Sequence, residues 1–335
     1  MKSPSTNCFD MVFNVYLDPK VIENAVSAVR TAPHGVQFIF AMLRGFVSNC
    51  LLFDFEDERL KREIRKALEA LPQEGNDRSD LMKIFAVLAK RNRFVAVFEP
   101  DYMSEKSDLE QVLPQLASHR IQLLVSDEEW VKECAAASGA EFSKLSSYQN
   151  SNFEKSRNEY ASYGLTFKGG EMRSGEFLEN TFGNALRHAR QIQIVDRLLG
   201  TRYSDNYIYS IKQFMKFLEC LLHDPERCEI VFHVGNCQGR NDYLCSTINN
   251  CRTTENSRMV LKVSFYTDSS GGADLPHERY ILTNQFAFDI GRGMDFFDTN
   301  NEGRNRDVEI NLKSLAAITA KLEQCAGSLS ASESL

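Results

Sequence analysis

The sequence predicts an α/β protein made of two α/β domains. Its 335 residues are about twice the common size of one domain. Short apolar runs rich in β-branched and aromatic residues alternate with amphipathic helical stretches, which is typical of a mostly parallel sheet with helical covers. Near the middle this periodicity is lost in a segment rich in Ser, Asn, Tyr, Lys and Gly. We therefore expect an N-terminal domain over residues 1–148, a linker or long surface loop over 149–174, a second domain over 175–325 and a flexible tail over 326–335.

Four strands and one long helix are expected in the N-terminal domain. The strands are short, apolar and bounded by polar residues, and they cover residues 13–17, 50–55, 94–98 and 121–125. The helix covers residues 56–71, because apolar side chains recur on one face and Pro72 and Gly75 follow. Its many charged side chains predict a solvated face with i to i+4 pairs. Trp130 is expected in the core.

The C-terminal domain repeats the alternation of strands and helices. Strands are expected over residues 191–195, 229–234 and 259–265, and residues 286–290 are expected to pair with the last of these. A helix over 207–222 carries an apolar stripe. The final helix is expected to end near Gly327 and to bury Leu312, Leu315, Ile318 and Leu322.

Composition excludes several classes of protein. The hydrophobic share of 43% and the charged share of 25% are ordinary globular values. With 39 basic and 46 acidic side chains the net charge is −7, so bulk charge cannot hold nucleic acid and any phosphate site must be local. Residues 1–10 lack the pattern of a secretory signal, and no run approaches the roughly 18 to 20 apolar residues of a membrane span. We expect a soluble cytoplasmic protein.

The nine cysteines are expected to be reduced thiols. The most closely grouped of them lack the paired C-x-x-C spacing of a zinc site; they are Cys228, Cys237, Cys245 and Cys251.

The most informative spacing runs through the last third of the chain. His277 is followed at fixed intervals by Arg279, Asn284, the Gly291-Arg292-Gly293 turn and Asp295. It resembles the signature of the phospholipase D superfamily, which is H-x-K, four residues, D, six residues and G-S. Arg279 stands at the Lys position, Asn284 at the Asp position and Arg292 at the Ser position, and these three replacements weaken the case for hydrolysis.

A narrower resemblance extends this one. The form His-x-Arg followed by Gly-Arg-Gly-x-Asp is similar to the phospholipase-D-like domain found C-terminal to MIT domains, and to its prokaryotic relatives. The run from Ala189 to Arg197 is similar to the opening of that domain. The resemblance covers about residues 175–322 and implies a mixed sheet flanked by helices.

The resemblance implies a function in phosphodiester chemistry. In the superfamily a His attacks phosphorus, a cation neutralises the phosphate oxygens, and a second His acts as general acid. One motif per chain implies a homodimer that joins two His277 side chains. The implied catalytic set is His277, Arg279 and Asn284, with no metal and no cofactor. Phosphate would bind Arg279, Arg292 and the glycines at 291 and 293, supported by Asp196 and Asp295.

Two readings of that function stay open. The first is a nuclease or nucleic-acid-binding component of a prokaryotic phage-defence system. The second is a non-catalytic adaptor that binds acidic lipid head groups or a protein partner through the same pocket. A protein partner could also bind through the N-terminal domain. The residues also have structural interpretations. Arg279 and Arg292 could pair with Asp295 or Asp298 to hold the turn, Asp196 could be a turn or capping group, and the glycines could be turn residues.

Carboxylates at apparent strand ends suggest a lower-ranked site in the N-terminal domain. Four of them, if they met at one edge of the sheet, would suit a divalent metal as in a PIN-type nuclease. Acidic residues after strands are also common helix caps. The four are Asp18, Asp54, Asp101 and Asp127.

Overall fold

Two compact units make up the chain. The computed structural model describes residues 11–28, 34–55, 58–71, 76–97, 108–199, 204–222, 228–236, 241–252, 259–267 and 274–335. One unit spans Val12–Ser162, and the other consists of Met11 and Tyr163–Leu335. Both combine a sheet with covering helices, so the α/β class with two domains is confirmed.

The N-terminal unit is a parallel sheet of five strands. Its order is β3-β2-β1-β4-β5, and every neighbouring pair is parallel. The strands are β1 (Phe13–Leu17), β2 (Cys50–Asp54), β3 (Phe94–Ala96), β4 (Ile121–Val125) and β5 (Glu141–Ser143). The first, second and fourth are buried almost throughout, as expected for parallel strands covered on both faces.

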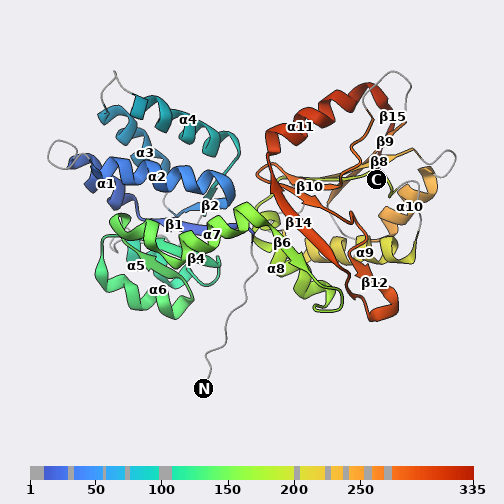
Figure 1. Cartoon of the computed structure of the whole chain (residues 1–335), viewed down its shortest axis with the longest axis horizontal. Helices are drawn as coiled ribbons and strands as arrows, with labels where there is room; N and C mark the ends of the chain where they lie inside the picture. Colours follow the sequence, from blue (N-terminus) through green and yellow to red (C-terminus); the bar gives the residue numbers. More distant parts are fainter. Residues whose placement is uncertain are drawn as a thin grey trace. The chain divides into compact units, whose positions relative to one another are not determined.

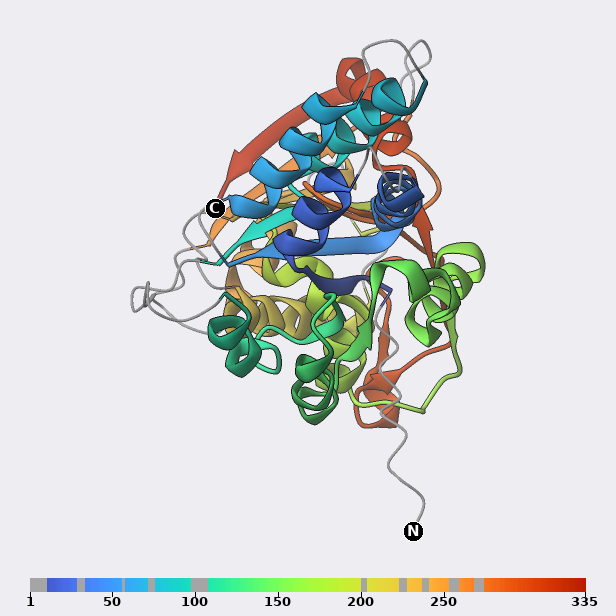
Figure 2. The ribbon, with the colours of Figure 1, turned by 90° about the vertical axis from the view of Figure 1, so that its left-hand side faces the viewer.

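Helices cover both faces of this sheet (Figures 1 and 2). The helices are α1 (Pro19–Ser27), α2 (His34–Asn49), α3 (Arg59–Ala70), α4 (Asn76–Lys90), α5 (Asp108–Val112), α6 (Lys132–Ser138) and α7 (Asn152–Tyr163). The first four pack on one face around a core that includes Val15, Leu43, Leu52 and Ile64. The α5 and α6 helices lie on the other face (Figure 1).

The C-terminal unit contains a mixed sheet of eight strands in the order β15-β9-β8-β7-β10-β11-β14-β6. Only β7, β8 and β9 are mutually parallel. The strands of this unit are β6 (Leu165–Phe167), β7 (Gln191–Asp196), β8 (Glu229–Gly235), β9 (Val260–Tyr266), β10 (Tyr280–Thr283), β11 (Ala287–Ile290), β12 (Phe297–Asp298), β13 (Arg304–Asn305), β14 (Val308–Lys313) and β15 (Leu329–Ser334). The short β12 and β13 form a separate ribbon.

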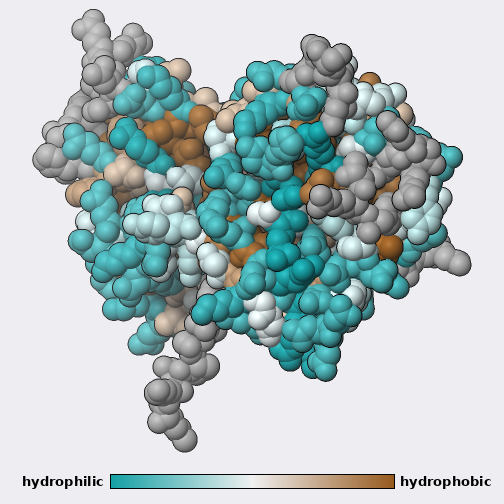
Figure 3. Space-filling model, turned by 45° about the vertical axis from the view of Figure 1, so that its right-hand side comes forward, coloured by the Kyte–Doolittle hydropathy of each residue, from teal (hydrophilic) through white to brown (hydrophobic). Residues whose placement is uncertain are grey.

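Four helices flank the eight-stranded sheet. They are α8 (Ser174–Arg187), α9 (Asp205–Leu221), α10 (Asn241–Asn250) and α11 (Leu315–Gln324). In Figure 1, α11 lies on the face opposite α8 and α9. It packs Ile318 and Leu322 against a small core with Val195, Tyr280 and Leu282. The visible surface of this unit in Figure 3 is mostly hydrophilic.

Several sequence predictions about connections were wrong. The expected linker or loop over residues 149–174 contains α7 and β6, because Phe153 and Leu165 supply buried anchors that sparse periodicity concealed. Residues 286–290 do not pair with residues 259–265: β11 pairs with β10 and β14.

The end of the chain also differs from the sequence prediction. Instead of a flexible tail over 326–335, β15 pairs with β9 at the edge of the sheet, where backbone hydrogen bonds replace the missing apolar pattern. Leu312 belongs to β14 rather than to the last helix. Trp130 is 52% exposed rather than buried.

Candidate phosphate site at the end of strand β10

The pairing of β7 with β10 creates the candidate site. The two strands are antiparallel, with Tyr280 opposite Val195. The residues just before Tyr280 therefore lie next to the residues just after Val195. This register brings His277 and Arg279 beside Asp196 and Arg197.

Asp196 is the buried anchor of this site. Its side chain is fully buried, and its two oxygens accept hydrogen bonds from the backbone N–H groups of Leu198 at 3.0 Å and Met294 at 2.9 Å. The Arg279 Nε atom lies 3.7 Å from Oδ1. Burial raises the pKa of the Asp196 carboxyl above its ordinary value, although these amide groups and Arg279 oppose the shift. The structural reading of Asp196 as a turn residue is therefore supported.

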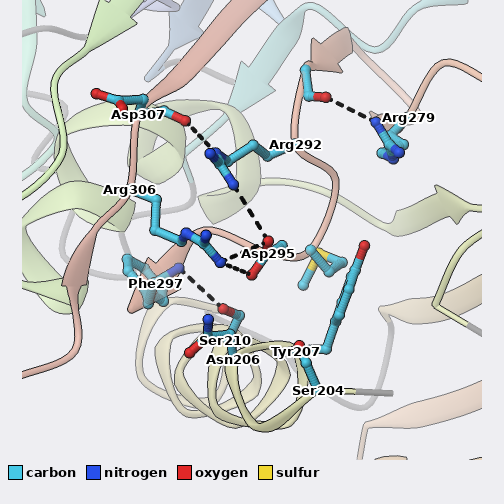
Figure 4. Close-up of polar contacts among 12 residues, drawn as sticks. Ser204, Asn206, Tyr207, Ser210, Arg279, Arg292, Asp295, Phe297, Arg306 and Asp307 are labelled. Atoms are coloured by element: carbon cyan, nitrogen blue, oxygen red, sulfur yellow. Dashed lines mark hydrogen bonds and ion pairs between the residues drawn. The ribbon is translucent and has the colours of Figure 1, made fainter. Parts of the chain in front are cut away.

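Arg279 is held by the glycine turn as well as by Asp196. Its guanidinium donates a hydrogen bond to the Gly291 carbonyl oxygen at 2.9 Å (Figure 4). Gly293 has φ +69°, and a Cβ atom there would lie 2.1 Å from the Asp196 Oδ2 atom and 2.4 Å from the Arg279 Cδ atom. Only glycine fits this position. The Arg279 side chain remains 24% exposed.

Arg292 points away from this cluster. Its Nε atom donates to the Asp307 carbonyl oxygen at 2.6 Å, and its NH1 lies 3.5 Å from the Asp295 carboxylate. Arg306 binds both oxygens of that same carboxylate, at 3.0 and 2.9 Å. Arg279 and Arg292 lie on opposite sides of the turn (Figure 4). The predicted convergence of both guanidinium groups on one phosphate is therefore wrong, and Arg292 with Asp295 matches the structural alternative.

His277 is exposed and contacts an arginine that the motif does not include. Its Nε2 atom lies 3.2 Å from the NH1 of Arg197. A guanidinium only donates hydrogen bonds, so Nε2 is the acceptor and the neutral imidazole carries its proton on Nδ1. Glu278 beside it faces Lys321 at 3.9 Å. Arg197 lies two residues after the predicted strand end at Val195, and this position was the available signal for its contact with His277.

Asn284 lies at the opposite end of β10 from His277. It sits in the hairpin before β11, and its side-chain oxygen accepts a hydrogen bond from the backbone N–H of Arg190 at 2.9 Å. Arg190 directly precedes β7, whereas Asp196 ends it. Asn284 therefore stabilises the hairpin, and its predicted place in a catalytic set with His277 is wrong.

The carboxylates of the N-terminal unit are used locally. Asp18 caps α1 by accepting from the Lys20 N–H at 3.0 Å, and its other oxygen accepts from the Ser126 hydroxyl at 2.8 Å. Asp127 accepts from the Asn24 amide at 3.3 Å.

The acidic metal site is therefore not supported. Asp54 is buried at the end of β2, and Asp101 lies outside the described residues. Within the described ranges, no three His, Cys, Asp or Glu side chains are arranged to hold a metal ion.

Comparisons with known proteins identify no family for the chain. No model of a protein family matches it, and no curated protein is a recognisable relative. The resemblance to the phospholipase D superfamily thus depends on the residues quoted from the sequence. Among the helices in the described ranges, none is long and apolar enough to span a membrane.

Proposed function

We propose that the C-terminal unit binds phosphodiester groups of nucleic acid beside His277, at the N-terminal end of β10, without hydrolysing them. The observation that supports this function is the exposed His277 imidazole in contact with Arg197, 3.2 Å away. Arginine presents a fork of donors that matches two phosphate oxygens. A phosphate that replaces the imidazole as acceptor would bind Arg197 and could accept a further hydrogen bond from a ring N–H of His277.

Arg279 stabilises the turn beside this site and does not itself contact the phosphate. Its charge faces buried Asp196, and one of its N–H groups is used by Gly291. A guanidinium whose charge is partly compensated by a carboxylate attracts a phosphate less strongly. We therefore assign Arg279 to orientation of the turn, and we assign Arg197 to direct contact because its NH1 atom lies 3.2 Å from the exposed His277 ring.

The contacts of the motif residues favour binding over hydrolysis. Nucleophilic attack needs the Nε2 lone pair of His277, which accepts a hydrogen bond from Arg197. Arg279, which stands at the Lys position of the motif, donates a hydrogen bond to the Gly291 carbonyl oxygen. Asn284 lies at the other end of β10 and accepts a hydrogen bond from the Arg190 N–H. The superfamily mechanism also needs a second His277 from another copy of the chain, and the homodimer remains a prediction.

Binding is tested by fluorescence anisotropy with labelled single-stranded DNA and RNA in the presence of EDTA. Arg197→Ala and His277→Ala should each weaken binding, and each lost phosphate contact should reduce the slope of log K against log salt by about 1. Arg190→Ala is the matched control, because it removes an exposed arginine at the other end of β7. Unchanged affinity in both site variants would contradict the proposal.

Three other outcomes identify other functions. Metal-independent cutting that is lost in His277→Ala would show that the site hydrolyses phosphodiesters. Cutting that needs Mg²⁺ and is lost in Asp18→Asn would place the activity in the N-terminal unit. Co-sedimentation with liposomes that depends on phosphoinositide would favour the lipid adaptor. The proposal implies a cytoplasmic protein, and the antiviral role remains an expectation from the resemblance.

A further inference from the structure

A hollow in the N-terminal unit lies between α3, α4 and β3, separate from the site on β10. It has an empty volume of about 380 Å³, part of which is open solvent. The space that a water-sized molecule can enter is about 120 Å³, less than the roughly 300–1,000 Å³ of enclosed ligand pockets, so a ligand here would lie partly in solvent. Its lining residues are Glu58, Lys61, Arg65, Phe85, Ala89, Asn92 and Phe94.

Two phenylalanine rings form the apolar wall of this hollow. The centroids of Phe85 and Phe94 are 5.8 Å apart and their planes meet at 55°. Phe94 is 9% exposed, whereas Phe85 is only half-buried and Ala89 is exposed. An aromatic or other flat apolar group can therefore reach the Phe85 ring from the solvent side.

Each ring carries a cation. The Lys61 Nζ atom lies 5.7 Å from the centroid of Phe94, and the Arg65 Cζ atom lies 5.8 Å from the centroid of Phe85. Lys61 is paired with the Glu58 carboxylate. For Arg65, which is exposed, the described part of the chain provides no ion pair. Its guanidinium therefore lies over an apolar surface with its charge available to an anion.

The backbone at this hollow adopts an uncommon conformation at two positions. Glu58 has φ 60° and Asn92 has φ 50°. Four non-glycine residues in the described ranges have positive φ, and two of them line this hollow. Asn92 closes the C-terminal end of α4, where Arg93 N–H donates to the Leu88 carbonyl oxygen and asparagine commonly adopts this conformation. At Glu58 the conformation costs free energy, as is frequent at binding sites.

We propose that this hollow binds a nucleotide, with the base on Phe85 and the phosphate on Arg65 and Lys61. A base that enters between Phe85 and Arg65 keeps a ring face on one side and a guanidinium on the other, and only the exposed Arg65 side chain has to rotate. Base stacking on an aromatic ring combined with a neighbouring arginine is a common way to bind single-stranded nucleic acid and nucleotides.

Glu58 limits the affinity of this site for anions. Its carboxylate is held beside Lys61, so it offsets one of the two positive charges at the rim. Removing that negative charge while keeping the shape of the side chain should strengthen binding. A site that binds cations or neutral aromatic compounds would respond in the opposite way or not at all.

Isothermal titration of the full chain with ATP, with inorganic tripolyphosphate and with a short oligothymidylate tests the proposal. We expect Arg65→Ala and Phe85→Leu to weaken ATP binding about tenfold, the order of one stacked base. Phe85→Leu keeps most of the apolar volume, so it separates the loss of the ring from unfolding. Glu58→Gln should tighten binding two- to fivefold. Lys83→Ala, on the same unit and 73% exposed in its side chain, is the control and should have no effect.

The ligands identify the source of the nucleotide. ATP binding without oligothymidylate binding supports a free nucleotide, and the reverse supports a single strand. Oligothymidylate is titrated into the Arg197→Ala chain, so binding at β10 does not contribute. Tripolyphosphate that binds as tightly as ATP, with no effect of Phe85→Leu, would overturn the proposal because the ring would play no part. Absence of binding by both ATP and oligothymidylate would overturn it as well.

Discussion

Each unit places a carboxylate beside an arginine, and the hydrogen-bond partners of the two pairs differ. In the N-terminal unit, the Arg157 side chain is 4% exposed and binds both oxygens of Glu154, at 2.8 and 2.7 Å, and the Gly45 carbonyl oxygen at 2.8 Å. In the C-terminal unit, Asp196 receives backbone N–H groups, and Arg279 stays 24% exposed. The guanidinium of Arg157 is used entirely for structure, whereas Arg279 lies at the edge of a site.

The pKa values of the two carboxyl groups are shifted in opposite directions from their ordinary values. Burial alone would raise the pKa of Glu154, but hydrogen bonds from Arg157 and Tyr148 outweigh it and lower the pKa below its ordinary value. Burial raises the pKa of Asp196 despite its amide donors and Arg279. Two differences explain this contrast: Glu154 has a direct bidentate ion pair and a side chain that is 16% exposed, whereas Asp196 has a more distant ion pair and is fully buried.

Gly293→Ala is expected to have the largest effect. The new Cβ atom would lie 2.1 Å from Asp196 Oδ2 at φ +69°, so the turn and the buried carboxylate cannot both keep their positions. We expect a loss above about 4 kcal/mol in the stability of the C-terminal unit, measured by hydrogen exchange of β7 and β10. Gly175→Ala is the control, because its Cβ atom would meet nothing within 4 Å. Equal stability of the two variants would contradict the tight packing at Asp196.

Arg157→Met should destabilise the N-terminal unit by about 3–4 kcal/mol, because it leaves the Glu154 carboxylate without its main partner. Urea unfolding followed by fluorescence measures this loss selectively, since the single Trp of the chain, Trp130, belongs to that unit. A change below about 1 kcal/mol would mean that the ion pair is not a structural anchor. Lys83→Met, an exposed cation, serves as the control.

The C-terminal unit should lose about 2–3 kcal/mol of stability as the pH falls from about 6.5 toward 4. His233 has its Nδ1 atom 2.8 Å from the Tyr266 hydroxyl and its Nε2 atom 3.0 Å from the Gln193 side-chain oxygen. Burial lowers its pKa to about 4. The neutral ring therefore stabilises the folded unit above the ordinary His pKa, and this contribution disappears as the pH falls through the folded value.

The raised pKa of Asp196 has the opposite effect on the stability of that unit, because its protonation at low pH favours the folded state. The experiment therefore compares wild type with His233→Gln. The variant should lose the part of the pH dependence that lies between pH 6.5 and 4, as measured by hydrogen exchange of β8. An identical pH profile in both proteins would show that His233 does not titrate in this range.

Arg279→Met should have the smallest effect, about 1 kcal/mol, because Asp196 keeps its backbone donors. The same substitution at Arg157 is expected to cost three times more, and the ratio measures the difference between the two pairs. Hydrogen exchange of β10 amides reports the change, with Arg190→Met as control. A loss equal to that of Arg157→Met would show that Asp196 depends on the guanidinium after all.

Much of the fold was predictable from the sequence. The strands at 13–17 and 121–125 have the expected bounds, because short, mostly apolar runs bounded by polar residues have few alternatives to a buried strand. The helix predicted over 56–71 covers α3 for a similar reason: its apolar stripe is regular. The edge strand β15 was missed because its serines carry no apolar alternation, and its backbone bonds to β9 come from the rest of the fold.

The candidate site was predicted only in part. The spacing from His277 to Asp295 correctly indicated a turn that holds charged groups, but it did not indicate where each side chain points. Arg292 and Arg279 are thirteen positions apart in sequence order, and the turn between Gly291 and Gly293 sends them to opposite sides. Arg197 was overlooked because its proximity to His277 depends on the register of β7 with β10.

The sequence by itself determined the α/β class, most strands and the need for glycine at a crowded turn, because these follow from local periodicity and backbone sterics. The tertiary structure alone decided which arginine meets His277, which carboxylate is buried and which strand closes the edge of the sheet. Those outcomes depend on strand register and on the packing of distant segments, and a one-residue change of register would turn each side chain to the other face.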